Sequence, residues 1–258
     1  MLDFQNILFE VGLVIILYMT IIFILALMRK DNSIVDVAWG IGFIIIAVYS
    51  IIQSGEVDLR KMIVTLLVSL WALRLSFHIL VRNSGKGEDF RYKAWRNTWK
   101  LFILRSFFQI FMLQGLFMLI ISFPIWFINF SNGGPLGPWD SIGLVMFGCG
   151  FLIETIADYQ LVDFKKNLEN HGKIITTGLW SISRHPNYFG EAMVWWGISF
   201  YALSFPHGWY TLISPLVITL LLRFVSGVPM LEKKFQSHPD WAAYKSSTAA
   251  FVPWLKFL

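Results

Sequence analysis

Seven long apolar runs constrain the fold of this chain more than any other feature of its sequence. Most of them reach the ~20 residues that a helix needs to cross the hydrocarbon core of a bilayer. Hydrophobic residues make up 56% of the chain and charged residues 14%, which excludes a soluble domain. We therefore predict an all-α integral membrane protein, a single domain over residues 1–258, with these seven spans: 7–28, 33–52, 62–82, 102–129, 140–160, 188–205 and 209–227.

Basic residues alternate between the connections and predict the orientation of the chain. Sixteen lysines and arginines follow the first, third, fifth and seventh spans, whereas the opposite side holds only Arg60 and Lys61. Because cytoplasmic segments are enriched in lysine and arginine, we expect the N-terminus outside and the C-terminus in the cytoplasm. The first run has no basic segment before it and no cleavage site after it, so it is expected to be a retained span.

The net charge of +5 and the single cysteine narrow the function classes further. The basic residues occur in short segments between apolar runs, a distribution typical of membrane orientation, so no nucleic-acid partner is expected. Cys149 stands alone within an apolar run, which excludes an intramolecular disulfide.

Ionisable side chains within the spans mark the first candidate site. Such residues are costly in hydrocarbon and usually face a cavity or one another. With the predicted topology they all lie toward the cytoplasmic side, which predicts a polar chamber open to the cytoplasm and closed by an apolar outer half. There are eight of them: Asp36, Arg74, His78, Arg105, Glu154, Asp158, Glu191 and Arg223.

Spacing relates some of these residues to one another. Arg74 and His78 are four positions apart and share a helix face. Asp36 lies one turn inside the second span, and we favour a functional role because lone carboxylates within a membrane usually have one. Three structural readings stay open: Arg105, like Arg82, extends its charged group to the membrane surface; Arg74 or Arg223 neutralises Asp36 or Glu154 in an ion pair; or His78 is a hydrogen-bonded packing residue.

The polar stretch from Gly178 to Glu191 is the second candidate site. Pro186 disfavours a helical conformation at His185 and suits the first turn of a helix, so we predict a polar turn leading straight into the sixth span. The free N–H groups of that first turn, together with Arg184, would bind an anionic group such as a phosphate. Within eight residues the stretch carries five polar side chains: Arg184, His185, Asn187, Tyr188 and Glu191.

This stretch also carries a family resemblance. Arg-His-Pro-x-Tyr-x-Gly at the start of a membrane helix resembles a signature shared by steroid 5α-reductase-like proteins and membrane methyltransferases of the isoprenylcysteine carboxyl type. The fuller form from Ser183 to Glu191, with Asp158 before it and Tyr244 and Val252-Pro253 after it, is closest to the bacterial branch of the 5α-reductase-like family. The resemblance covers most of the chain and implies a bacterial inner-membrane protein with its active site facing the cytoplasm.

The resemblance implies NADPH-dependent reduction of a carbon–carbon double bond conjugated to a ketone in a steroid-like lipid. Asp36 matches the acidic residue in the second span of the family and would be the proton donor to the substrate carbonyl, helped by His78 or Arg74. The tyrosine that the family has on its third span has no clear equivalent, and Tyr92 lies beyond the membrane edge. We expect a monomer without a metal ion, in which the half over about 140–258 binds the cofactor through these residues: Asp158, Lys165, Arg184, His185, Asn187, Tyr188, Glu191, Arg223 and Tyr244.

Two alternatives remain beside the reductase. Methyltransferases that use S-adenosylmethionine share the Arg-His-Pro-x-Tyr turn, but they usually carry paired glutamates after the last span, where this chain has Glu232-Lys-Lys. A non-enzymatic lipid-binding or transport protein would account for the chamber, but not for the Asn187-Tyr188 turn and the Tyr244 tail on the same side. The absence of a Gly-x-Gly-x-x-Gly motif predicts that helix ends and loops hold any dinucleotide.

Overall fold

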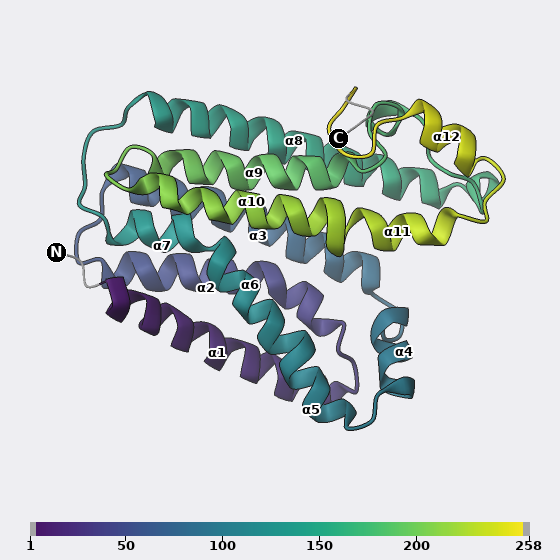
Figure 1. Cartoon of the computed structure of the whole chain (residues 1–258), viewed down its shortest axis with the longest axis horizontal. Helices are drawn as coiled ribbons and strands as arrows, with labels where there is room; N and C mark the ends of the chain where they lie inside the picture. Colours follow the sequence, from purple (N-terminus) through teal and green to yellow (C-terminus); the bar gives the residue numbers. More distant parts are fainter. Residues whose placement is uncertain (1–3, 255–258) are drawn as a thin grey trace. The chain divides into compact units, whose positions relative to one another are not determined.

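Helices form every named element of the structure, a computed structural model that describes residues 4–254. Within this range a single isolated parallel bridge, between Ser183 and Ala249, is the sole β-type pairing. The all-helical prediction is therefore confirmed (Figure 1). The chain divides into two compact units, an N-terminal unit up to Leu136 that also includes Tyr201–Thr211, and a C-terminal unit of Gly137–Phe200 and Leu212 onward.

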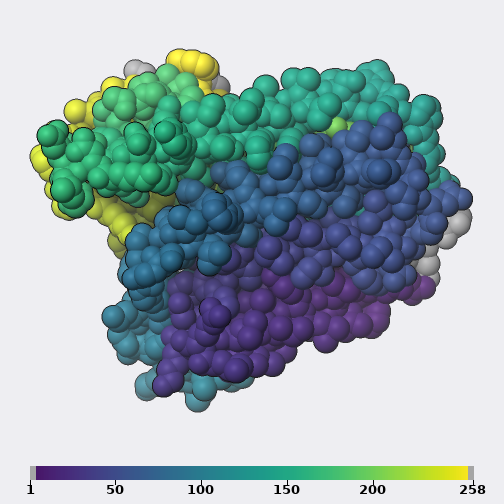
Figure 2. Space-filling model, turned by 180° about the vertical axis from the view of Figure 1, so that it is seen from behind, coloured from purple at the N-terminus to yellow at the C-terminus, as the bar shows by residue number. Residues whose placement is uncertain are grey.

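The N-terminal unit is built around α2, which packs against α1, α3 and α7. Figure 2 shows α1, α2 and α3 side by side on one face, coloured from purple to blue. The helices of this unit are α1 (Phe4–Arg29), α2 (Ile34–Gln53), α3 (Leu59–Asn83), α4 (Phe90–Thr98), α5 (Phe102–Ser106), the π-helix η1 (Phe107–Met112), α6 (Leu113–Ile121), α7 (Phe123–Phe130) and most of the 3₁₀-helix η4 (Gly208–Leu212).

Gly40 allows α2 to lie directly on α3. A Cβ atom at this position would stand 2.5 Å from both the Ala72 carbonyl oxygen and the Ser76 hydroxyl oxygen. The Ser76 hydroxyl also donates a 2.8 Å hydrogen bond to the Val37 carbonyl. These contacts hold the first two turns of α2, which include Asp36, against α3.

The predicted fourth span, 102–129, is interrupted in the structure. Helix continues from Phe102 to Ile121, with a π-helical segment at Phe107–Met112. Ser122 then separates α6 from α7, and Pro124 stands at the start of α7. Proline has no N–H to donate to the preceding turn, so the helix ends and a new one begins.

The C-terminal unit is formed by two long helices and the segments that follow them. Gly190 lets α8 and α9 approach closely, because a Cβ there would lie 2.6 Å from the Glu154 amide nitrogen and from the Gly150 carbonyl oxygen. The elements are α8 (Pro138–Lys166), η2 (Leu168–Asn170), η3 (Gly178–Ser181), α9 (Pro186–Ala202), α10 (Ile213–Leu220), the π-helix η5 (Leu221–Val225), α11 (Val228–Phe235) and α12 (Trp241–Ser247).

Six helices in the described range are long and apolar enough to cross a membrane, which fits an integral membrane protein. α9 corresponds to the predicted span at 188–205, but it has only 17 residues and is not among the six. A seventh span and the orientation of the two termini stay predictions. The six helices are Phe4–Arg29, Ile34–Gln53, Leu59–Asn83, Phe102–Ile121, Pro138–Lys166 and Gly208–Phe235.

Candidate functional site

The carboxylate of Asp36 lies in the first turn of α2 and is bound by two side chains of α4. Arg91 Nη2 donates to Asp36 Oδ2 over 2.9 Å, and the Tyr92 hydroxyl donates to Asp36 Oδ1 over 2.6 Å. The Asp36 side chain is 17% exposed, whereas Tyr92 is 3% exposed. The acid therefore has both a cation and a phenol as partners and keeps one accessible edge.

The connections around α4 hold it in this position. Asp89 caps the helix by accepting hydrogen bonds from the backbone N–H and the side chain of Arg91, and its own N–H donates to the Ser33 hydroxyl over 2.7 Å. Glu88 accepts a bidentate pair from Arg96 at 2.6 and 2.9 Å and a 2.9 Å bond from the Asn32 N–H. The α1–α2 connection is thus clamped to the segment that begins α4.

The neighbouring carboxylates help to keep Tyr92 and Arg91, the two donors to Asp36, protonated. Burial, followed by the negative charge of Asp36, raises the pKa of the Tyr92 phenol above its ordinary value. Burial lowers the pKa of Arg91, but the carboxylates of Asp36 and Asp89 raise it by more. At neutral pH the cluster therefore has a neutral phenol and a cationic guanidinium on either side of the carboxylate.

The two predicted helpers of Asp36 lie on α3. Arg74 and His78 are half-buried and one turn apart, and each has interactions within the chain. The hydrogen bonds that hold the Asp36 carboxylate come from α4 instead, so catalytic roles for Arg74 and His78 stay predictions.

The second cluster belongs to the C-terminal unit and begins where α9 begins, at Pro186, as the sequence predicts. Arg184, two residues earlier, is buried and donates from Nε to Glu232 over 2.8 Å. Its Nη1 donates to the carbonyls of Thr248 and Lys245 at 2.5 and 3.1 Å. Arg184 therefore joins α9 to α11 and to the C-terminal tail.

The tail and the polar turn form one substructure. The Arg184 N–H donates to the Ala249 carbonyl over 2.8 Å, and the Ser183 hydroxyl donates to the Phe251 carbonyl over the same distance. The hydroxyl of Tyr244, on α12, donates to the Trp180 carbonyl over 2.6 Å. The polar groups of Arg184 and Tyr244 are thus engaged with the backbone around the turn.

His185, Tyr188 and Arg223 line the same region. The His185 ring stacks on Tyr188 with 5.7 Å between centroids, and its Nε2 lies 3.3 Å from Glu232. Burial lowers the pKa of His185, as do the charges of Arg184 and Arg223, and together they outweigh the hydrogen bond to Glu232. His185 is therefore neutral at pH 7.

Arg223 lies on the π-helix η5, a type of turn that often occurs at functional sites. Its Nε is buried, and within residues 4–254 it has no hydrogen-bond partner. The guanidinium carbon stands 4.8 Å from the centre of the Phe224 ring. A buried guanidinium N–H without an acceptor is suited to an anionic ligand.

The remaining predicted cofactor residues lie on α8 and α9. The Asn187 amide donates to Asp158 Oδ1 over 3.1 Å, which brings together two of the residues predicted from the family resemblance. Lys165 is exposed in the last turn of α8, and Glu191 is buried in the second turn of α9.

The sequence did not assign four residues that organise these clusters: Glu88, Arg91, Tyr92 and Glu232. Asp89 before a helical segment is a recognisable capping signal for α4. However, no spacing in the sequence indicates that α4 turns back onto residue 36, or that Glu232 binds Arg184 and His185.

Comparison with known proteins gives the family. The chain matches the family described as "Protein of unknown function (DUF1295)" over residues 22–248, which is most of its length. The chain belongs to this family. The DUF1295 family is part of the superfamily of steroid 5α-reductase-like and isoprenylcysteine carboxyl methyltransferase-like proteins.

Three curated relatives resemble the chain in part. An uncharacterized protein of Schizosaccharomyces pombe is 29% identical over 199 residues, which are 67% of this chain and 57% of the relative. The probable O-methyltransferase ustE of Ustilaginoidea virens is 41% identical over 51 residues, 20% of this chain and 18% of the relative. The steroid 5-alpha-reductase DET2 of Gossypium hirsutum is 42% identical over 55 residues, 21% of each chain. The chain thus spans little more than half the length of the Schizosaccharomyces pombe relative. No solved structure matches the chain.

Proposed function

We propose that this protein is a membrane oxidoreductase that reduces a carbon–carbon double bond conjugated to a ketone in a steroid-like lipid, with NADPH as the hydride donor. Membership of the superfamily and the partial similarity to a steroid 5α-reductase support this reaction class. The observation that carries the proposal is the 2.6 Å hydrogen bond between the Tyr92 hydroxyl and the Asp36 carboxylate, in the first turn of a membrane helix. The family that the chain resembles has a tyrosine on its third span, which this chain lacks. Tyr92 on α4 would take the place of that tyrosine beside the acid.

The reaction requires a proton donor at the substrate carbonyl. When hydride reaches the β-carbon, negative charge develops on the carbonyl oxygen, and a preorganised donor lowers the barrier by stabilising it there. The proton of this pair lies on the Tyr92 hydroxyl, which donates to the Asp36 carboxylate, and the more exposed Asp36 is the member that a ligand reaches first. The Tyr92 O–H bond breaks as its proton passes through Asp36 to the enolate oxygen, Tyr92 is left as a phenolate, and the enol then tautomerises to the saturated ketone.

Arg91 has a positioning role in this scheme. Its guanidinium, 2.9 Å from Asp36, stabilises the negative charge that the pair keeps after the proton has left. The accessible edge of Asp36 then allows the pair to regain a proton from water.

The residues of the second cluster fit an anionic dinucleotide. Arg223 offers a buried N–H without an acceptor among the described residues, and the first turn of α9 offers backbone N–H groups and the Asn187 amide. NADPH would be held by Arg223, Asn187, Tyr188 and Lys165, and when bound it supplies the hydride. Asp158 orients Asn187, and Arg184 and Tyr244 fix the turn through their backbone hydrogen bonds.

The proposal is tested with the full chain purified in detergent. Incubation with NADPH and a 3-oxo-Δ4 steroid should consume NADPH and yield a product heavier by two hydrogen atoms. NADPH that carries deuterium at the transferred position should label the β-carbon. No reduction, together with methyl transfer from labelled S-adenosylmethionine to a lipid, would replace the reductase by the methyltransferase.

Methyl transfer is the second candidate because of one structural relation. Glu232, which lies on α11 after the predicted last span at 209–227, binds both Arg184 and His185, so a glutamate at this position is part of the polar turn. The partial similarity to a probable O-methyltransferase agrees with this candidate. Binding of neither NADPH nor S-adenosylmethionine would favour a lipid-binding or transport protein.

A further inference from the structure

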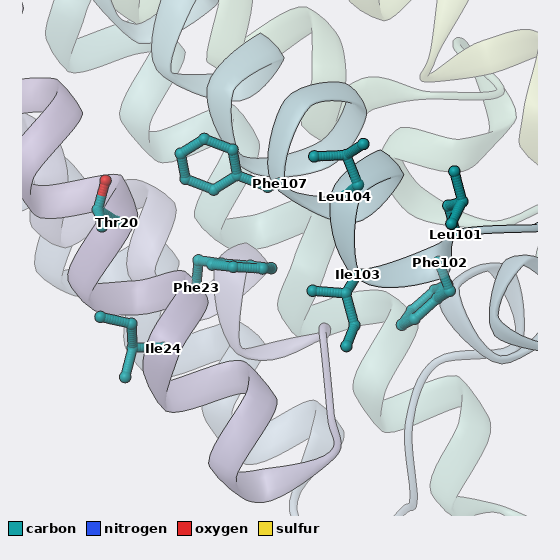
Figure 3. A pocket seen from close by; sticks show the side chains of 8 residues that line it. All are labelled: Thr20, Phe23, Ile24, Leu101, Phe102, Ile103, Leu104 and Phe107. Carbon is teal, nitrogen blue, oxygen red and sulfur yellow. The ribbon is translucent and has the colours of Figure 1, made fainter.

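An apolar groove runs between α1 and the α5–η1 segment of the N-terminal unit. Its volume is about 760 Å³, within the range of ~300–1,000 Å³ that is usual for small-molecule sites. In Figure 3 the ring of Phe23 on α1 extends toward Ile103 of α5, and Phe107 of η1 lies above it. The lining residues are Thr20, Phe23, Ile24, Leu101, Phe102, Ile103, Leu104 and Phe107.

The lining suits hydrocarbon. Phe23 forms the floor, where its ring packs against Phe107 at 5.1 Å and Phe111 at 5.2 Å between centroids. Ile24 and Ile103 form exposed walls. The hydroxyl of Thr20 already donates to the Ile16 carbonyl over 2.7 Å, so the groove presents an apolar surface to its ligand.

Basic side chains gather at one end of this groove. Along α1 the groove leads toward Arg29 and Lys30, and on the other side Lys100 lies two residues before the start of α5 at Phe102. Arg105 lies one turn beyond Leu101, on the same helix face. The 3.1 Å hydrogen bond from Asn32 Nδ2 to Ser106 Oγ brings the end of α1 to α5.

These cations are available to a ligand. Arg29, Lys30, Lys100 and Arg105 are all exposed, and no carboxylate in the described part of the chain forms an ion pair with any of them. A groove for hydrocarbon that ends in four unpaired cations is complementary in charge and polarity to an anionic lipid.

Tryptophans mark the depth of this end in the bilayer. Trp95 and Trp99 stack with 5.1 Å between centroids, and the Arg105 guanidinium carbon lies 6.0 Å from the centre of the Trp99 ring. Tryptophan is enriched at the level of the lipid headgroups. Lys100 and Arg105 therefore stand where a lipid phosphate would lie.

We propose that the groove binds one anionic glycerophospholipid, with an acyl chain along Phe23, Ile24 and Ile103 and its phosphate among the four cations. The site uses none of the residues assigned to the proposed reduction, so either proposal can fail without the other. A specific site should prefer an anionic headgroup, whereas non-specific contact of bulk lipid with the helix surface should not. The test therefore compares two lipids that differ only in the headgroup.

Native mass spectrometry of the detergent-purified chain measures the binding directly. Phosphatidylglycerol should be retained in one copy, and phosphatidylcholine with the same acyl chains should not. In the double variant Lys100→Gln/Arg105→Gln the affinity for phosphatidylglycerol should fall about 25-fold, about fivefold for each cation. Ile24→Trp should abolish retention by filling the groove, and soluble glycerol 3-phosphate should not bind.

Matched controls are available in the C-terminal unit. Leu144→Trp places the same ring on α8 at a position that is 49% exposed, compared with 50% for Ile24. Lys166→Gln/Lys233→Gln removes two exposed cations elsewhere. Both controls should retain phosphatidylglycerol like wild type, and thermal melts of all variants confirm folding. Equal retention of the two lipids by wild type, full retention by folded Ile24→Trp, or equal losses in the controls would overturn the proposal.

Discussion

The Tyr92 hydroxyl donates a 2.6 Å hydrogen bond to the Asp36 carboxylate, although the two residues are 56 positions apart in the sequence. This bond joins the first turn of a membrane helix to a short helix that follows the next span. Carboxylates inside membranes are costly, and those that remain usually serve a function. With Arg91 on its other oxygen, Asp36 is held in one orientation while part of its surface stays accessible.

Replacing Asp36 tests whether it is the acid of the proposed reaction. Asp36→Asn keeps the shape of the side chain but removes the acid, so reduction of a 3-oxo-Δ4 steroid should fall ~100-fold or more. NADPH affinity and thermal stability should stay close to wild type. Steady-state rates and melting temperatures of the purified variant measure both effects.

A structural role for Asp36 would give the opposite result. Arg91 would then keep only the Asp89 carboxylate as an ion-pair partner, and the protein would lose stability. Normal turnover per folded molecule in a destabilised Asp36→Asn protein would remove Asp36 from the mechanism.

Tyr92→Phe separates the contribution of the Tyr92 hydroxyl from that of its aromatic ring. The ring should keep its edge-on contact with Trp95, at 5.6 Å between centroids, while Asp36 loses one of its two hydrogen bonds. We expect the reduction rate to fall at least tenfold and stability to fall by about 1.5–3 kcal/mol, the usual value of a hydrogen bond to a charged group. Tyr159→Phe, at an exposed position on α8, should leave both quantities unchanged. An unaltered rate in folded Tyr92→Phe would show that the phenol does not take part.

Local signals explain which parts of the fold could be predicted from the sequence. Continuous apolar runs give the long helices, because length and hydropathy alone decide whether a segment can span a bilayer. The residue-level rules for proline correctly place the start of α9 at Pro186. The same rules indicate a boundary at Pro124, but hydropathy continues past it, and the interruption at Ser122 was therefore missed.

Partners that are distant in sequence could not be predicted in this way. Asp36 was expected to lie near Arg74 and His78 because all three occur at similar depth in neighbouring spans. That placement stays a prediction. The two hydrogen bonds from α4 to Asp36 depend on how the Glu88–Asp89 connection binds Asn32 and Ser33, a tertiary relation that leaves no periodic pattern. Asp158 and Asn187 were both identified through the family resemblance, and their 3.1 Å contact depends on the close approach of α8 and α9 at Gly190.

The proposed nucleotide site is tested by binding rather than by activity. In Asn187→Ala and Arg223→Gln the affinity for NADPH should fall by at least tenfold, because each change removes a group that can donate a hydrogen bond to the ligand. Isothermal titration with NADPH and with S-adenosylmethionine compares the two cofactors on the same protein. Asn97→Ala, exposed on α4, should bind like wild type. Tight binding of S-adenosylmethionine without binding of NADPH would reverse the ranking of the two enzymes.

The tail should contribute measurably to the stability of the C-terminal unit. Tyr244→Phe removes the 2.6 Å hydrogen bond to the Trp180 carbonyl and leaves that acceptor without its donor. We expect a loss of about 1–3 kcal/mol, seen as a lower melting temperature and faster proteolysis after α11. Tyr210→Phe, at an exposed position, provides the comparison. Identical melts for the two variants would mean that the tail docks without this bond.

Acid should weaken the clamp that holds α4, through Glu88. Burial raises the pKa of Glu88, but the hydrogen bonds from Arg96 and the Asn32 N–H and the charges of Arg96 and Lys93 lower it by more, so it lies below its ordinary value of 4.5. A carboxylate whose pKa is depressed by folding stabilises the folded state fully when the pH is above its pKa in the unfolded chain. This contribution is lost as the pH falls through its pKa in the folded chain.

Melting temperatures between about pH 3 and 7 should therefore be higher for wild type than for Glu88→Gln at neutral pH, and the difference should shrink below pH 4.5. Glu169→Gln, at an exposed position in η2, should follow the wild-type curve throughout. A constant difference between wild type and Glu88→Gln across this range would mean that the ionisation of Glu88 does not hold α4 in place.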